Sequence, residues 1–486
     1  MNTIFKTLII IVSILSIGCS DLFDEINTNP NDKTTADVNQ LFTYSVVKGI
    51  SAYNSDVYLH QWGIASWMMH LAPLGGVEAG KEYEMPTGKD NYWAEQYTLG
   101  LRNANEVVKL TKGNAELINK TSIANIWQAF LFLRLTDLWG AIPYSDALKG
   151  LDELILMPAY NSQKEIYMGL FDQLKNAAES LDNTKTSFGD ADPIYKGDVE
   201  NWKRFANSIR LRMAIRIKYV EPELAQQIIN ELEILPLIET NEHSALFPYN
   251  WDYKNPFAEI FQTGQDNGKN HPSNFFMDYL KSINDPRIGI YAEPTVFSLL
   301  IGMPDYVGIP NLVSAGSSEW DNYKDSAFIS FMGEYFTNVE NPGLLLTHAE
   351  VCFLKAEAAL EGWISGTPES YLEEGIRSEF KRFGLELDES KIESYLNNLP
   401  DVTLELIITQ KWVAFAYLNS YEAYADYRRT GYPVLTDYYN NPINENQIPK
   451  RLTYPSSEVS LNYENYLDAI KIQGEDKPTT NLWWNN

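Results

Sequence analysis

The sequence has few cysteines, few basic residues and no long apolar run. Cys19 and Cys352 are the only cysteines among 486 residues, so a disulfide framework is excluded and packing must hold the fold together. Lysine and arginine total 38 against 65 aspartates and glutamates, for a formal net charge of −27. Because this excess of negative charge repels other anions, we do not expect the chain to bind nucleic acid or an anionic membrane surface through its own electrostatic field. Beyond the first 18 residues, no segment approaches the roughly 20 apolar residues of a membrane-spanning helix.

The short motifs that mark common catalytic and cofactor sites are also missing. There is no His-Glu-x-x-His, no Gly-x-Ser-x-Gly, no phosphate-binding glycine loop and no Cys-x-x-Cys. The dispersed histidines, no two of which have a metal-ligand spacing on one helix, are His60, His70, His243, His271 and His348. We therefore predict a binding protein, not an enzyme, with no cofactor and no metal. A glycoside hydrolase is the less favoured alternative, because a carboxylate pair has no sequence motif.

Three aspartates, Asp190, Asp192 and Asp198, lie close together in a segment with two glycines and one proline. Their spacing is not that of a helix-loop-helix calcium site, which needs a glutamate at the twelfth loop position. A solvated turn is the prediction.

The N-terminus has the pattern of an export signal. Lys6 supplies a positive charge, residues 8–18 form an apolar stretch too short to cross a bilayer, and Cys19 follows at the cleavage position. We expect residues 1–18 to be removed as a lipoprotein signal peptide and Cys19 to be acylated, so that the lipid attaches the chain to a membrane. Residues 19–37 are polar and predict a lipidated tether. The alternative is a secretory signal that is cut elsewhere.

Aromatic residues make up 13% of the chain, and 30 of them are tyrosines. Tyrosine and tryptophan combine an apolar face with a polar tip, which suits surfaces that bind sugars or peptides. The candidate ligand-binding residues are the aromatic and polar side chains of three predicted loop clusters: Tyr83, Tyr92 and Trp93; Trp251, Asp252 and Tyr253; Trp320, Asn322 and Tyr323. The alternative for each ring is packing onto the body of the protein.

Helical periodicity covers most of the chain. It predicts helices at residues 38–70, 92–110, 115–138, 162–181, 201–219, 223–235, 273–282, 346–363, 369–383, 391–396 and 404–429. Ser162 and Glu165 form a capping-box pattern, and Gly140 with Pro143 predicts the end of the third helix. Residues 237–341 and the tail from Tyr432 lack sustained periodicity. The prediction is a mainly α, single domain over residues 38–486, built of tetratricopeptide-like helical hairpins with a loop-rich ligand-binding region at about 237–341. An irregular helical bundle is the alternative.

Seven blocks resemble the SusD/RagB family of outer-membrane lipoproteins of Bacteroidetes, most closely its SusD-like nutrient-binding branch. They are residues 25–31 (EINTNPN), 134–146 (RLTDLWGAIPYSD), 197–216 (GDVENWKRFANSIRLRMAIR), 285–287 (DPR), 346–363 (LTHAEVCFLKAEAALEGW), 410–433 (QKWVAFAYLNSYEAYADYRRTGYP) and 451–458 (RLTYPSSE). The blocks follow the family's order and span essentially the whole mature chain.

The resemblance implies a function at the cell surface. Such a protein captures an oligosaccharide or a peptide, delivers it to a SusC-type TonB-dependent transporter and acts as the lid of that transporter. It implies a lipid-anchored protein in the outer membrane, facing the exterior. The family's ligand loops share no motif, so no binding residue carries over by position. A helical-repeat scaffold with no ligand of its own is the alternative.

Several arginines within the matching blocks lie in otherwise apolar predicted helices. Arg134 can pair with Asp137 one turn away, or with neighbouring backbone. We predict buried pairing with carboxylates or carbonyl groups for this residue and for Arg210, Arg212, Arg216, Arg428 and Arg429. An anion-binding site is the alternative.

Overall fold

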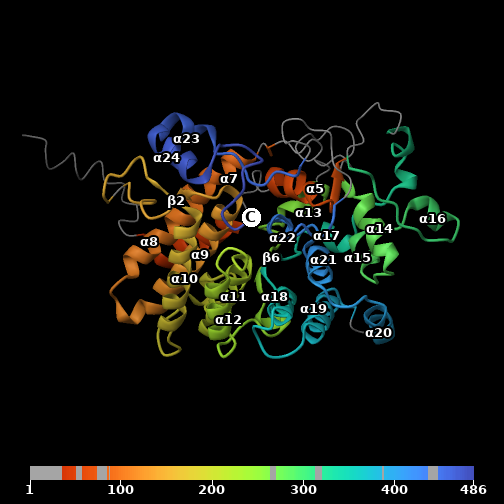
Figure 1. Ribbon diagram of the computed structural model, residues 1–486, viewed down its shortest axis with the longest axis horizontal. Coiled ribbons are helices and arrows are strands. Elements are labelled where there is room, and N and C mark those ends of the chain that lie inside the picture. Colours follow the sequence, from red (N-terminus) through yellow and green to blue (C-terminus); the bar gives the residue numbers. More distant parts are fainter. Residues whose placement is uncertain are drawn as a thin grey trace, which may run out of the picture.

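The computed structural model describes residues 36–50, 57–73, 85–86, 88–150, 152–262, 270–311, 320–385, 388–435 and 447–485. Cys19 and Tyr83 lie outside these ranges. The molecule is mainly α-helical, as predicted, with short strands between the helices (Figure 1).

The N-terminal half is a row of helices that pack on their neighbours in the sequence (Figure 1). The row comprises α3 (Val38–Ile50), α7 (Lys89–Glu95), the π-helical η2 (Gln96–Leu101), α8 (Arg102–Thr111), α9 (Ile118–Trp139), α10 (Gln163–Ser180), α11 (Val199–Arg216) and α12 (Pro222–Leu232). Successive pairs from α8 to α12 contact each other, so the predicted helical hairpins are confirmed. Between α3 and α7 lie η1 (Val57–Ile64) and α5 (Ala65–Trp67), also helical.

Local signals set several helix ends. Ser162 Oγ accepts a hydrogen bond from the Glu165 backbone N–H at 3.2 Å, and Glu165 Oε2 accepts one from the Ser162 N–H at 2.8 Å, so the predicted capping box is confirmed. Helix α9 ends at Gly140, whose φ of 86° favours glycine.

The C-terminal half contains a second group of packed helices, and here one predicted helix is wrong. The group comprises α18 (His348–Leu360), α19 (Pro368–Arg382), α20 (Glu389–Asn397), α21 (Leu404–Phe415) and α22 (Ser420–Thr430). The single helix predicted over residues 404–429 is broken between α21 and α22, where Tyr417 has a φ of 68°. The break inserts the fully buried Tyr417 ring among Phe257, Phe276 and Phe336. Tertiary packing of one aromatic ring thus overrides a continuous helical pattern.

The tail, predicted to be irregular, contains two helices. These are α23 (Ser456–Leu461) and α24 (Tyr463–Gln473), and they lie over the N-terminal half, above α8 and α9 (Figure 1). Helix α24 contacts β3 (Tyr160–Asn161). Asn and Pro near these short helices weakened the periodicity on which the prediction depended.

The described parts of residues 237–341 contain short elements, as their weak periodicity predicts, but more than one of them is helical. Besides short 3₁₀ turns, these elements are β4 (Ala245–Phe247), α13 (Pro256–Gln262), β5 (Asn270–Pro272), α14 (Asn274–Ser282), α15 (Ile288–Tyr291), α16 (Val296–Leu300) and α17 (Glu334–Thr337). Antiparallel pairs join β5 to β1 (Leu71–Pro73) and β4 to β6 (Gly343–Leu346), while β2 (Ile142–Pro143) pairs with β3. The β1–β5 and β4–β6 ladders attach the irregular region to both helical halves.

Most of the arginines of the matching blocks are paired inside the protein, as predicted. Arg134 is half-buried and lies over the Phe130 and Tyr421 rings, while Asp137, its predicted partner, pairs with Arg216. Arg216 pairs with Asp137 of α9 and Glu422 of α22. Arg429 pairs with Glu357 and, at 3.1 Å, with Asp426. These side chains balance one another's charge in the interior.

The turn predicted to be solvated around Asp192 is instead packed into the fold. Asp192 is buried and accepts hydrogen bonds from Trp202 Nε1 at 2.6 Å and from the Gly197 N–H at 2.9 Å. Burial raises the pKa of this carboxyl group. Asp198 caps α11 by accepting from the Asn201 N–H at 2.9 Å.

Candidate functional site

The turn between β4 and α13 places one predicted cluster on the surface. Asn250 Oδ1 accepts hydrogen bonds from the backbone N–H groups of Asp252 and Tyr253, at 2.9 and 2.8 Å. The backbones of Asn250 and Tyr253 also bond each other in both directions. This Asx-type turn forces the side chains between its ends outward.

Within this turn, the two tyrosines pack onto the body of the protein and the tryptophan faces solvent. Tyr249 is buried, its ring stacks on Tyr253 with centroids 5.9 Å apart, and the Tyr253 hydroxyl donates to the Val47 carbonyl at 3.1 Å. Trp251, by contrast, is 63% exposed, and the Lys254 Nζ lies 5.7 Å from its ring centroid. Asp252 is also exposed. An indole face beside an exposed carboxylate and an ammonium group matches what a sugar ring needs from a binding surface: an apolar platform and hydrogen-bonding groups at its edge.

A small cavity lies behind this turn. It has a volume of about 60 Å³ and is lined in part by Tyr249, Asn255, Arg134 and His60. That volume holds water and not a sugar ring, so a ligand at this turn would lie on Trp251 and outside the cavity.

The cluster at residues 320–323 occupies a different part of the irregular region. It begins in the 3₁₀ turn η6 (Trp320–Asn322). Asn322 is exposed, whereas Tyr323 is half-buried and packs against Ala72, Ile309 and Ile329. The Trp320 side chain lies outside the described residues. This cluster therefore offers Asn322 to a ligand and uses much of Tyr323 for packing.

The cluster at Tyr92 and Trp93 is mostly internal. Tyr92 has an exposed fraction of 0%, and its ring stacks on Trp139 with centroids 6.3 Å apart. It has no free face for a ligand in this structure, because α7 turns it into the core. Trp93 is 4% exposed and packs edge-on against Trp139 at 5.2 Å.

Trp93 does, however, line one wall of a groove that the sequence did not indicate. The groove has a volume of about 560 Å³ and lies between α7–α8 and α23. Its polar lining includes Arg102, Glu106 and Glu458, the last of which accepts a 2.6 Å hydrogen bond from the Tyr160 hydroxyl. The size falls in the range of small-ligand pockets. Sequence reasoning missed it because the wall at α23 comes from the tail, about 360 residues after Trp93 along the chain.

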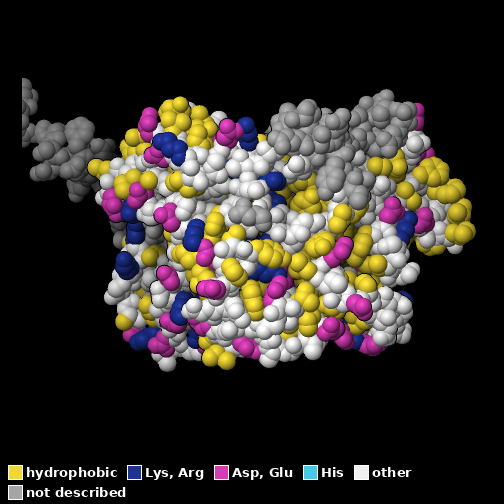
Figure 2. Space-filling view, viewed as in Figure 1, with side chains coloured by type: hydrophobic (Ala, Val, Ile, Leu, Met, Phe, Trp, Pro, Cys, Tyr) yellow, Lys and Arg dark blue, Asp and Glu magenta, His cyan; other side chains and the backbone are white. Residues whose placement is uncertain are grey.

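An apolar surface lies around α16, at one end of the molecule (Figure 2). Its exposed side chains belong to Val296, Phe297, Leu299, Leu300, Ile301 and Met303. Leu300 is 79% exposed. A contiguous run of this kind is typical of surfaces that contact another molecule.

The comparisons with known proteins identify the family. A family model of SusD-like proteins, described as starch-binding and associating with the outer membrane, matches residues 30–455. The chain belongs to the SusD-like family. The resemblance expected from the seven blocks is thereby confirmed. A comparison with curated proteins gave no match.

Solved structures agree with the SusD-like assignment. A chitin-binding protein is 26% identical over 93% of this chain and 100% of its own, with a TM-score of 0.82. A chitin-binding SusD homologue from Flavobacterium johnsoniae is 25% identical over 92% of this chain and 98% of its own, with a TM-score of 0.77. A SusD homologue from Bacteroides uniformis is 26% identical over 92% and 99% of the two chains, with a TM-score of 0.75.

The SusD-like family is associated with the outer membrane. In the part of the chain that the structure describes, no helix has the length and apolar character to cross a membrane.

Proposed function

We propose that this SusD-like protein is a lipid-anchored, cell-surface protein that binds an oligosaccharide and delivers it to a SusC-type TonB-dependent transporter, acting as the lid of that transporter. The observation that carries the proposal is Trp251, an exposed indole on a braced turn, in a chain whose relatives include chitin-binding proteins. Exposed aromatic faces of this kind favour a sugar over a strongly charged ligand. A peptide is the alternative nutrient.

The proposed contact residues differ in how far their side chains are exposed to a ligand. Trp251 and Asp252 are exposed on the same turn, and Asn322 is exposed at a second position. Tyr253 and Tyr323 are half-buried and belong to these two surfaces. Trp93 is buried against Trp139 and lines the separate groove between α7–α8 and α23. Tyr83 and Trp320 are proposed as ligand contacts on the basis of the sequence alone.

The binding proposal is tested by titrating the purified chain, without its transporter, with chitin and starch oligosaccharides. Saturable binding of either series supports it. A helical-repeat scaffold with no ligand of its own would bind neither, nor any peptide mixture offered in the same way. Analysis of the sugars after incubation separates a binder from a glycoside hydrolase, because only a hydrolase shortens them.

The transporter partnership is supported by family membership and by the exposed apolar run at α16. Co-expression with a SusC-type transporter from the same organism, followed by affinity isolation, tests it. We expect a stable complex in detergent, and a dissociated pair would contradict the lid.

Attachment through Cys19 is tested with a labelled fatty-acid precursor in cells. Wild type should incorporate label and a Cys19→Ala variant should not, because the acylated cysteine is the proposed anchor. An unlabelled wild-type chain at the cell surface would contradict the lipid anchor and leave the ligand proposal intact.

A further inference from the structure

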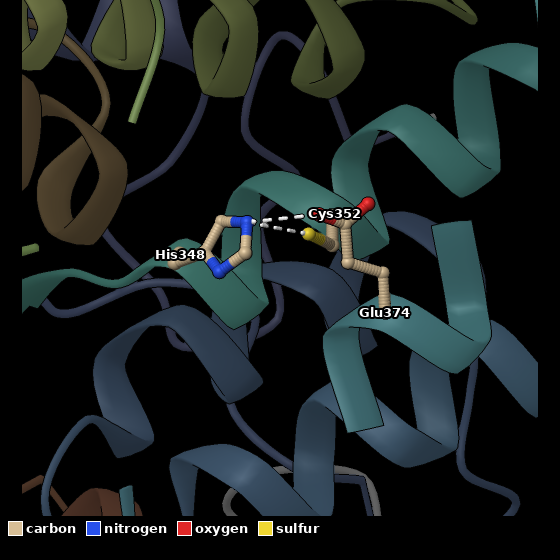
Figure 3. Close-up of side chains that lie close together, drawn as sticks. All are labelled: His348, Cys352 and Glu374. Atoms are coloured by element: carbon tan, nitrogen blue, oxygen red, sulfur yellow. Dashed lines mark hydrogen bonds and ion pairs between the residues drawn. The ribbon is translucent and has the colours of Figure 1, made fainter. Parts of the chain in front are cut away.

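Three side chains with metal-binding atoms meet between α18 and α19, and none of them is among the residues named in the proposed function (Figure 3). His348 Nε2 lies 3.2 Å from Cys352 Sγ and 3.4 Å from Glu374 Oε1. All three ligand atoms lie within 4.8 Å of one another. His348 and Cys352 are one turn apart on α18, while Glu374 comes from α19.

The local structure holds these side chains in place. His348 is the first residue of α18, and its backbone N–H donates to Ser244 Oγ at 3.0 Å. Helix α19 approaches α18 closely beside Glu374, because a Cβ on Gly375 would lie only 2.6 Å from the Phe353 ring. The two helices are therefore packed at the point where the cluster forms.

The separations of His348 Nε2 from the other two ligand atoms match a tetrahedral zinc ion. Zinc binds nitrogen and oxygen at about 2.0–2.1 Å and thiolate sulfur at about 2.3 Å, so neighbouring tetrahedral ligand atoms lie roughly 3.3–3.6 Å apart. The observed 3.2 and 3.4 Å separations are close to these values. Imidazole, thiolate and carboxylate together favour Zn²⁺ over Ca²⁺ or Mg²⁺, which prefer oxygen ligands.

The charges and the access also fit a zinc ion. A thiolate and a carboxylate neutralise the two positive charges of the ion. This offsets the repulsion between a cation and the partial positive charge at the N-terminus of α18. Lys355 also faces the cluster, but its ammonium group lies over the Tyr371 ring at 5.7 Å. Cys352 is buried, whereas the Glu374 side chain is 54% exposed and opens the cluster to solvent.

We propose that His348, Cys352 and Glu374 form a binding site for one Zn²⁺ ion, with water as the fourth ligand. Binding replaces the hydrogen bond between His348 and Cys352 with two metal–ligand bonds, and the thiol proton leaves to solvent. The search for histidine pairs in the sequence missed the site, because its signal is a His-x-x-x-Cys spacing on one helix and the third ligand is 22 residues further on.

The test is a titration of the tag-free mature chain with Co²⁺, followed by displacement with Zn²⁺. We expect one equivalent of Co²⁺ to produce a thiolate-to-cobalt charge-transfer band that Zn²⁺ abolishes. Cys352→Ser should remove the band. Glu374→Gln should weaken metal affinity by about 10- to 100-fold or more, the range already found for residues that only support metal ligands.

Glu373→Gln is the matched control. Glu373 precedes Glu374 on α19 and pairs with Arg377 at 2.8 Å instead, so its variant should keep wild-type metal affinity. Glu374 is exposed enough that its variant folds, which keeps the test valid even if Cys352→Ser is unstable. The absence of a charge-transfer band in wild type, or equal affinity in wild type and Glu374→Gln, would overturn the zinc site.

Discussion

Arg212 and Glu350 form a bidentate ion pair in the interior, with Nε–Oε1 and Nη2–Oε2 distances of 2.7 and 2.8 Å. Their side chains are 2% and 1% exposed, and they join α11 to α18 across 138 residues of sequence. Arg212 also donates to the Leu345 carbonyl at 2.7 Å. The pair therefore ties the N-terminal row of helices to the C-terminal group.

This pair belongs to a larger balanced set of interior charges. Five cations and five carboxylates take part: Arg212, Arg216, Lys218, Lys411 and Arg429 with Asp137, Glu350, Glu357, Glu422 and Asp426. Equal numbers of opposite charges reduce the cost of burying each one. Removing one partner should consequently lower the free energy of unfolding by more than the intact ion pair contributes to it.

Glu350→Ala should lower the free energy of unfolding by about 3–5 kcal/mol, because it leaves Arg212 without its bidentate carboxylate in the interior. Urea unfolding followed by tryptophan fluorescence measures this. The control is Arg377→Ala, which removes a surface arginine that also contacts several carboxylates, including Glu373 and Glu389. It should cost about 1 kcal/mol at most. Similar losses for the two variants would contradict the role assigned to burial.

Stability should fall below about pH 6.5 because of two buried histidines. Burial, and secondarily the charge of Arg134, lowers the pKa of His60 from 6.5 to about 3. Burial likewise lowers the pKa of His70 to about 3. Above pH 6.5 both imidazoles are neutral in the folded and in the unfolded state, so their contribution to the free energy of unfolding is fully present. Between pH 6.5 and 3 the unfolded chain binds protons that the folded chain does not, so stability is lost.

At about pH 5 the loss should reach about 2 kcal/mol for each of these histidines. Comparing urea unfolding at about pH 7.5 and pH 5 measures it. His60→Gln should reduce the difference between the two pH values by about 2 kcal/mol, since its amide oxygen can still accept from the Ser420 N–H that His60 Nε2 now binds. A pH difference unchanged in this variant would contradict the assignment to His60.

Trp251→Ala should weaken oligosaccharide binding by about 10-fold, the loss of roughly 1.4 kcal/mol of aromatic stacking. Stability should change little, because the side chain is 63% exposed. Tyr44→Ala is the matched control: Tyr44 is 44% exposed and has Lys48 5.9 Å from its ring, as Trp251 has Lys254. If both variants kept wild-type affinity in a calorimetric titration, Trp251 would not be the platform.

Gly140→Ala should destabilise the protein by about 2–3 kcal/mol through backbone strain and overpacking. Gly140 has a φ of 86°, and a Cβ there would lie 2.1 Å from Gln473 Oε1, which accepts a hydrogen bond from the Ala141 N–H. Gly113→Ala isolates the strain, since Gly113 has a φ of 83° with nothing within 4 Å of the added Cβ, and should cost about 1 kcal/mol. Equal thermal unfolding midpoints for the two variants would show that contact with α24 adds nothing.

Local sequence signals predicted the structure well where neighbours along the chain decide it. The capping box at Ser162 and the helix end at Gly140 are set within a few residues, and both are confirmed. The break at Tyr417 and the burial of Asp192 depend on partners far away, such as the ring of Phe336. Periodicity carries no information about such partners, so the prediction failed at these positions.

The sequence by itself determined the helical-hairpin architecture, the family and the residue types available for binding, because helical periodicity, capping and motif order are local properties of the chain. Only the tertiary structure decided which aromatic rings face solvent. Trp251 and Tyr92 are equally plausible in the sequence, but the Asx turn at Asn250 directs Trp251 outward while α7 turns Tyr92 onto Trp139. Packing of α19 on α18 also brought Glu374 to His348 and Cys352. These side chains come together only when the two helices pack in the folded protein.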